Sequence, residues 1–134
     1  MASATLLLKA FNKHFFQFID DIITIFPDNT DIPKSRDYLE TIKTANPLIL
    51  IKIWHKFIFI PYHAEVAHGN LTFFFEKDYR DDLKQLPNSE KILETIENSV
   101  RDPLRKMNPD NMEKCKKHFQ LITTLCAQYM EMKK

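Results

Sequence analysis

The sequence predicts an all-α fold: a single compact multi-helix domain, residues 1–134, with long first and last helices around a phenylalanine-rich core. Three observations support this prediction. The chain has eleven phenylalanines but one glycine, and so little glycine supplies almost none of the positive-φ positions that tight β-hairpins need. Apolar residues recur at helical spacing near both ends of the chain. A chain of this length fits one domain and can bury a core without disulfides or metal.

Residues 3–26 are predicted to form the first long helix. Its apolar side chains step by three and four residues, which is the spacing of a seam that packs on a neighbouring helix. The seam consists of Leu8, Phe11, Phe15, Phe18, Ile22 and Ile25. Turn-forming residues at 27–30 end this helix. Asp31 is then expected to cap a second helix over residues 32–45, with Pro33 in its first turn.

The most apolar stretch is NPLILIKIWHKFIFIPY, residues 46–62. It is too short and too charged for a membrane helix, which needs about 20 predominantly apolar residues. Its polar residues Lys52, His55 and Lys56 would form one narrow stripe on a helix, whereas a strand would place them on both faces. The pattern therefore predicts a nearly all-buried central helix over residues 47–60.

Prolines bound this central helix in the prediction. Asn46 can cap its start, Pro47 suits the first helical position, and Pro61 is expected to stop it. A short helix and turn is expected at 62–70, a helix at 71–86, and a further helix that ends near Pro103 or Met107.

The last helix is predicted over about residues 110–132, after the Asn108-Pro109 start. Its apolar seam again steps by three and four residues. This seam consists of Met112, Cys115, Phe119, Ile122, Cys126 and Tyr129.

The scarcity of glycine also excludes several enzyme classes. Phosphate-cradling loops, dinucleotide fingerprints and nucleophile elbows need glycines where the backbone turns sharply or approaches a ligand closely. Two cysteines form no disulfide framework, and the N-terminus lacks the basic region of a secretory signal. We therefore expect an intracellular, non-enzymatic protein without a cofactor.

Three clusters have the residue types of a metal site, but the structural interpretation is favoured for each. His63 and His68 are five residues apart, which separates the imidazoles by about 140° on a helix and spoils the zinc-protease spacing. Cys115 and His118 form only half of a zinc site. The carboxylates at 78, 81 and 82 match the acidic first turn of a helix as well as a divalent-cation site.

The C-terminal third is mildly basic and suggests contact with an anion. Residues 106–134 carry six basic and three acidic side chains. The candidate contacts are Arg101, Arg105, Lys106, Lys114 and Lys117. Nucleic-acid binding through this patch is the alternative function, although neighbouring acids dilute the patch and no nucleic-acid-binding motif accompanies it.

The end of the last helix is a candidate protein-docking surface. The two apolar seams are expected to pack on each other. Failing that, Tyr129, Met130 and Met132 would be exposed and would dock a neighbouring subunit, because methionine adapts its shape and tyrosine keeps a polar tip. Self-association or binding of another protein is therefore expected.

The stretch from Asn46-Pro47 through Trp54, Pro61-Tyr62 and Gly69-Asn70 to FFEKDY (74–79) resembles small helical proteins of unassigned function from large icosahedral DNA viruses. The resemblance covers about residues 11–86 and lies in the spacing of hydrophobic and turn residues. It implies a viral protein made in the host cytoplasm, such as a minor capsid or other virion component. Together with the residue patterns, it leads us to expect a structural or interaction protein.

Overall fold

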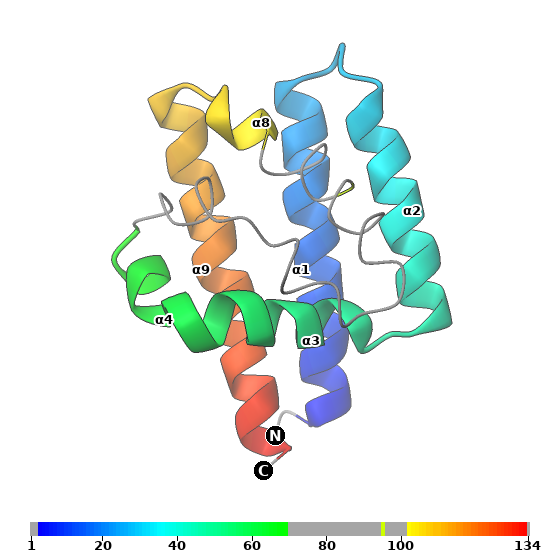
Figure 1. Cartoon of the computed structure of the whole chain (residues 1–134), viewed down its shortest axis with the longest axis vertical. Helices are drawn as coiled ribbons and strands as arrows, with labels where there is room; N and C mark the ends of the chain where they lie inside the picture. Colours follow the sequence, from blue (N-terminus) through cyan, green and yellow to red (C-terminus); the bar gives the residue numbers. More distant parts are fainter. Residues whose placement is uncertain (1–2, 70–94, 96–101, 134) are drawn as a thin grey trace.

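A computed structural model of the chain describes residues 3–69, 95 and 102–133. Every regular element in these residues is a helix, and the first and last helices are the longest, which confirms the predicted class (Figure 1). In chain order they are α1 (Ala4–Ile25), α2 (Asp31–Ala45), α3 (Ile49–Trp54), the π-helical segment η1 (His55–Phe59), α4 (Ile60–Ala67), α8 (Asp102–Arg105) and α9 (Pro109–Met132).

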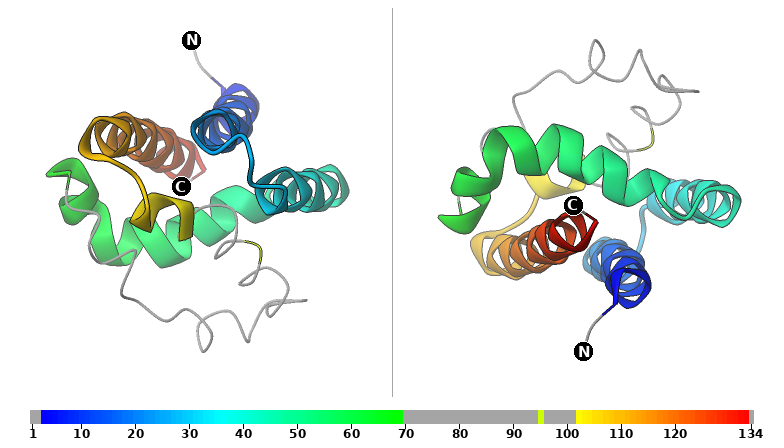
Figure 2. Two further views of the ribbon diagram at one scale, coloured as in Figure 1. Left: turned by 90° about the horizontal axis from the view of Figure 1, so that it is seen from above. Right: turned by 90° about the horizontal axis from the view of Figure 1, so that it is seen from below.

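The long helices α1 and α9 lie side by side and run in opposite directions, so their outer ends meet at the end of the molecule where both termini lie (Figure 1). Helix α2 returns along the other flank of α1. The continuous segment α3–η1–α4 crosses one face of the α1–α9 pair, as the end-on views show (Figure 2). The described helices therefore form a bundle with one helical segment laid across it.

Side-chain caps begin both long helices. The hydroxyl of Ser3 accepts a hydrogen bond from the Leu6 amide at 3.1 Å, and Oδ1 of Asn108 accepts one from the Asn111 amide at 2.8 Å. Pro109 occupies the first turn of α9, where its missing N–H costs nothing. The expected start of the last helix at Asn108-Pro109 is confirmed.

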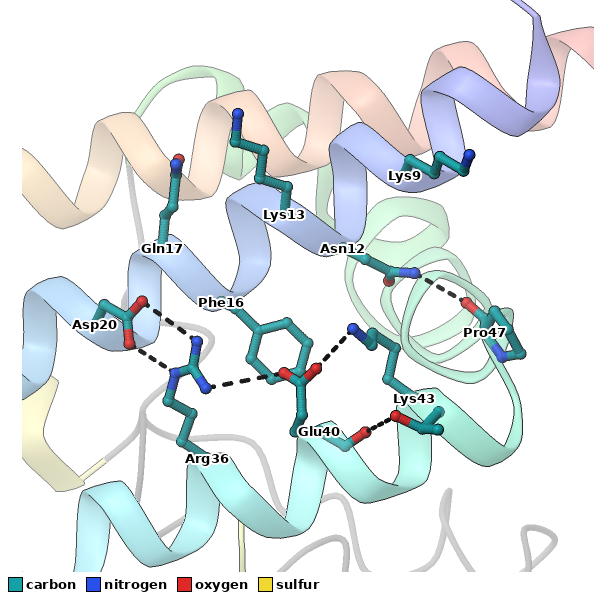
Figure 3. A pocket seen from close by; sticks show the side chains of 11 residues that line it. Lys9, Asn12, Lys13, Phe16, Gln17, Asp20, Arg36, Glu40, Lys43 and Pro47 are labelled. Carbon is teal, nitrogen blue, oxygen red and sulfur yellow. Dashed lines mark hydrogen bonds and ion pairs between the residues drawn. The ribbon is translucent and has the colours of Figure 1, made fainter.

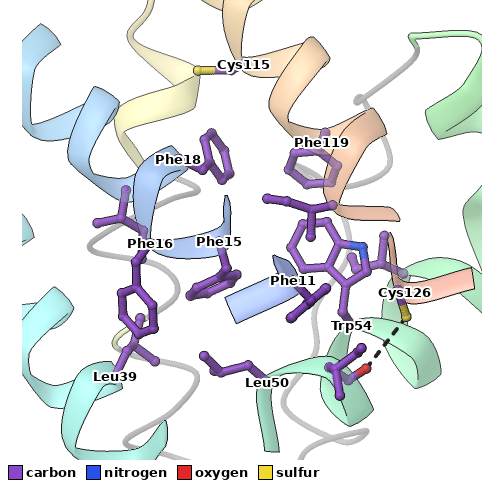
Figure 4. Close-up of a cluster of buried hydrophobic side chains, with 14 of the residues drawn as sticks. Phe11, Phe15, Phe16, Phe18, Leu39, Leu50, Trp54, Cys115, Phe119 and Cys126 are labelled. Atoms are coloured by element: carbon purple, nitrogen blue, oxygen red, sulfur yellow. Dashed lines mark hydrogen bonds between the residues drawn. The ribbon is translucent and has the colours of Figure 1, made fainter. Parts of the chain in front are cut away.

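The core lies where the two predicted seams meet the central segment (Figure 4). The indole of Trp54 packs 4.8 Å from the ring of Phe119 and 6.2 Å from that of Phe11, measured between ring centroids. Phe11 and Phe119 are fully buried. The seams therefore pack on each other, and the phenylalanine-rich core and the buried position of Trp54 are confirmed.

The expected cap of α2 is wrong. Asp31 lies in the first turn of the helix, while Oδ1 of Asn29 accepts hydrogen bonds from the amides of Asp31 at 2.9 Å and Ile32 at 3.3 Å. Asn29 thus satisfies two N–H groups that the first helical turn leaves without partners.

The expected stop at Pro61 is also wrong, because the helix continues through it to Ala67. The amide of Ile60 bonds to the carbonyl of His55, five residues back, so the turn just before the proline is wider than an α-helical turn. A wider turn relieves the clash between a proline ring and the preceding turn. The remaining kink is absorbed at Tyr62, whose φ and ψ are −135° and 15°.

The only glycine of the chain ends this segment. Gly69 has a φ of +76°, a conformation that glycine adopts without steric cost, and its amide bonds to the carbonyl of Val66 at 3.0 Å. The helix predicted at 71–86 lies outside the described residues. The further helix expected to end near Pro103 or Met107 is described only at Thr95 and near its expected end, where α8 spans Asp102–Arg105.

Candidate binding groove between α1 and α2

A groove with a volume of about 510 Å³ separates α1 from α2 (Figure 3). Along α1 its lining extends from Lys9 to Asp20, which corresponds to roughly 16 Å of helix. The lining residues are Lys9, Asn12, Lys13, Phe16, Gln17, Asp20, Arg36, Glu40, Lys43, Thr44 and Pro47. Four of them are basic and two are acidic, so the described lining has an excess of positive charge.

A chain of ion pairs holds the middle of the groove (Figure 3). Nε of Arg36 donates to Asp20 at 2.6 Å, and Nζ of Lys43 donates to Glu40 at 2.7 Å. The same two cations lie over the ring of Phe16, at 5.1 and 5.4 Å from its centroid. Two contacts, one ionic and one to an aromatic face, thus fix each cation and the relative position of α1 and α2.

The end of the groove nearest Pro47 carries the unbalanced charge. Lys9 and Lys13 are exposed, and neither has an acidic partner within the described part of the chain. They are four residues apart on α1, which places their Cβ atoms about 6 Å apart on one face. Both acidic residues of the groove are already paired with Arg36 and Lys43, so this end can accept anionic groups.

Asn12 closes the groove beneath these lysines. Its Nδ2 donates to the carbonyl of Pro47 at 3.1 Å and so ties α1 to the turn after α2. Its Oδ1 is buried and has no hydrogen-bond partner among the residues that the structure describes. The side chain is therefore held by one hydrogen bond at a position where a second would be favourable.

This groove was not predicted from the sequence. In the sequence, Lys13 and Asp20 lie on the polar side of the first helix, and the packing of this side against α2 is a tertiary feature. The available signal was the i, i+4 pair Lys9 and Lys13 on that polar side, and a solvated helix face gives the same signal.

The predicted anion contacts lie elsewhere, on α8, α9 and the turn between them. Arg105, Lys106, Lys114 and Lys117 are exposed, while Arg101 lies outside the described residues. Acidic Asp110 and Glu113 occupy the first turns of α9 beside them, and Glu113 pairs with Lys116 at 3.7 Å. This surface is of mixed charge, as the sequence indicates.

The predicted docking residues do not form one exposed surface. Tyr129 is buried in the core, with 6 % of its surface exposed, and Met130 is packed against that core. Met132 is 46 % exposed. The interpretation in which the seams of α1 and α9 bury each other is the one observed, and it removes Tyr129 from any docking surface.

The residues considered for metal binding have other contacts. Nδ1 of His63 donates to the carbonyl of Phe59 at 2.9 Å, and Nε2 of His118 pairs with the carboxylate of Asp21 on α1. No group of three or more metal-ligating side chains occurs in the part of the chain that the structure describes. The carboxylates at 78, 81 and 82 lie outside it.

Both cysteines are buried in the core and unpaired. Burial raises the pKa of each thiol to about 12, and the Asp21 carboxylate adds to this effect at Cys115. The thiol of Cys126 donates to the carbonyl of Ile51 at 3.7 Å. These contacts are those of small hydrophobic residues in a packed seam.

Comparison with protein-family models, with curated proteins and with solved structures finds no match. Among the described helices, none combines the length and the apolar character that crossing a membrane requires.

Proposed function

We propose that this protein is a non-enzymatic interaction protein that binds an acidic segment of another protein in the groove between α1 and α2. The observation that carries the proposal is the pair of exposed lysines, Lys9 and Lys13, at the end of a groove whose acidic residues are already paired. Carboxylates of a partner would complete the charge balance there and speed association.

The shape of the groove favours a peptide segment over a single small anion. Its length of roughly 16 Å matches three turns of helix or about five extended residues. Acidic side chains four residues apart on a partner helix would have the same spacing as Lys9 and Lys13. Docking of a helix in a groove between two helices is a common mode of peptide recognition.

The ion pairs in the middle of the groove support the same proposal. Arg36 and Lys43 are held by Asp20, Glu40 and the ring of Phe16 before any partner arrives. A surface that is already ordered loses less side-chain entropy when it binds.

The viral resemblance supplies a setting for this function. Small helical proteins of large icosahedral DNA viruses suggest a minor capsid or virion component made in the host cytoplasm, and the acidic segment would then belong to another virion protein. The support for this setting is the spacing of hydrophobic and turn residues between 46 and 79.

A peptide titration tests the proposal. The probe is a fluorescein-labelled, alanine-based helical peptide with glutamates four residues apart, followed by fluorescence anisotropy at low salt. We expect binding that weakens as salt rises, and at least tenfold weaker binding by the Lys9→Glu/Lys13→Glu variant. The matched control is Lys114→Glu/Lys117→Glu, which makes the same charge change on α9 outside the groove.

The same two variants distinguish peptide binding in the groove from the alternative function, which is nucleic-acid binding. If the basic surface of α8 and α9 binds nucleic acid, duplex DNA should bind with a steep salt dependence, and the variant altered at Lys114 and Lys117 should lose it. Equal peptide binding by both variants would refute the groove proposal.

A further inference from the structure

A second groove, of about 460 Å³, lies where η1 and α4 pass over α9. Its described lining is Phe59, His63, Val66, Ala67, Gln120, Thr123, Thr124, Ala127 and Gln128. None of these residues is an aspartate, glutamate, lysine or arginine, in contrast to the groove between α1 and α2. A ligand with a permanent charge would find no opposite charge in this lining to offset its desolvation.

One wall of this second groove is aromatic, and the π-helical turn shapes it. The rings of Phe59 and His63 lie 5.1 Å apart with an angle of 30° between their planes, and His55 stacks on the other side of Phe59 at 5.5 Å. Because Nδ1 of His63 donates to the Phe59 carbonyl, the orientation of that imidazole is held. Because imidazoles cover both faces of Phe59, this wall offers a flat ligand the edge of that ring and the imidazole of His63.

The opposite wall is polar and comes from α9. Nε2 of Gln120 donates to the carbonyls of Val66 and Ala67, at 3.2 and 3.3 Å, which leaves its Oε1 as an acceptor. Gln128 is exposed and has no hydrogen-bond partner within the described residues, so its amide can both donate and accept. Between the walls, Val66 and Ala127 supply a small apolar floor.

We propose that this groove binds a small, uncharged, planar heteroaromatic molecule of the nucleobase class. Such a ring has a flat face for the Phe59–His63 wall and an edge of donors and acceptors for the amides of Gln120 and Gln128. A cavity of this size exceeds the needs of one base and falls in the range of small-molecule sites. The proposal is independent of the acidic-segment groove.

The fluorescence of Trp54 can report ligand binding in this second groove. Thr123 lines the groove, and its hydroxyl accepts a hydrogen bond of 2.9 Å from the indole of Trp54, the only tryptophan in the sequence. A ligand beside Thr123 should therefore change the emission of Trp54. The experiment is a titration of the full chain with adenine, followed by tryptophan emission and by calorimetry.

Substitutions on α9 test whether adenine binds in this groove. Thr124→Arg places a long side chain in the groove and should weaken adenine binding at least tenfold, whereas Leu121→Arg, at an exposed position outside the lining, should leave it unchanged. Gln128→Ala removes one amide from an exposed position and should weaken binding several-fold. This second variant keeps the test decisive if Thr124→Arg disturbs folding.

Three results would overturn the proposal. The first is the absence of saturable binding by both methods. The second is adenine binding that Thr124→Arg and Gln128→Ala leave unchanged in the folded state, as judged by circular dichroism. The third is adenosine 5′-monophosphate binding more than tenfold tighter than adenine, because that preference would require a cation that the described lining lacks.

Discussion

At the scale of single residues, the hydrogen bond between Trp54 and Thr123 is the most informative polar contact of the core. It joins the crossing segment to α9 at 2.9 Å, and both side chains are buried. Thr123→Val keeps the shape of the side chain but leaves the indole N–H without its partner. We expect it to lower the free energy of unfolding by about 1–3 kcal/mol, measured by urea denaturation with tryptophan emission as the signal.

Thr123→Ser is the matched control, because it loses a methyl group but keeps the hydroxyl. Its cost should be the smaller of the two. If the Thr123→Val variant proves as stable as the wild-type chain, the indole N–H must have another partner and the assigned contact is wrong.

The buried cysteines yield a prediction about reactivity. A thiol reacts as its thiolate, and a pKa raised from 9.0 to about 12 makes the thiolate of Cys115 or Cys126 rare at pH 8. We expect both to react with a thiol reagent at pH 8 far more slowly in the folded protein than in denaturant. Rapid labelling of the folded chain, or stoichiometric zinc bound through these thiols, would contradict their burial.

At the scale of elements, the end of α9 separates core from surface within a few residues. Met132 is half exposed, whereas Tyr129 is buried and Met130 packs on the core. Removing residues 132–134 should leave thermal unfolding almost unchanged. Removing residues 128–134 should cost about 3–5 kcal/mol, the range for deleting a buried aromatic side chain.

Circular dichroism at 222 nm measures both truncations. If the longer truncation is as stable as the shorter one, Tyr129 does not belong to the core. Tyr129 would then be available to an exposed docking surface at this end of α9.

Most helices could be predicted from the sequence, because the seams of α1 and α9 repeat at helical spacing over many turns. The errors are at Asn29, at Pro61 and at the start of the central helix, which lies at Ile49 instead of Pro47. Asn29 and Asp31 are both good capping residues, and only the path of the turn decides which side chain reaches the free amides. Proline usually ends a helix, and the wider π-helical turn that accommodates Pro61 leaves no pattern in the sequence.

At the scale of the whole molecule, each candidate groove lies between helices that come together only when the chain folds. The groove between α1 and α2 needs Lys9 and Lys13 from one helix and Arg36 and Lys43 from the other. From the sequence these residues resemble solvated helix faces, and their convergence follows from packing alone. The basic residues of the C-terminal third, by contrast, are neighbours in sequence, so the sequence alone indicates their cluster.

A nuclear magnetic resonance titration of the ¹⁵N-labelled protein with the glutamate-bearing helical peptide would locate the binding surface directly. We expect the largest shift changes at amides of residues 9–20 and 36–44, the two stretches that carry the residues lining the groove between α1 and α2. A peptide of the same length with glutamine in place of glutamate should cause much smaller changes. Changes confined to residues 105–117, or none at all at saturating peptide, would contradict the proposal that this groove is the binding surface.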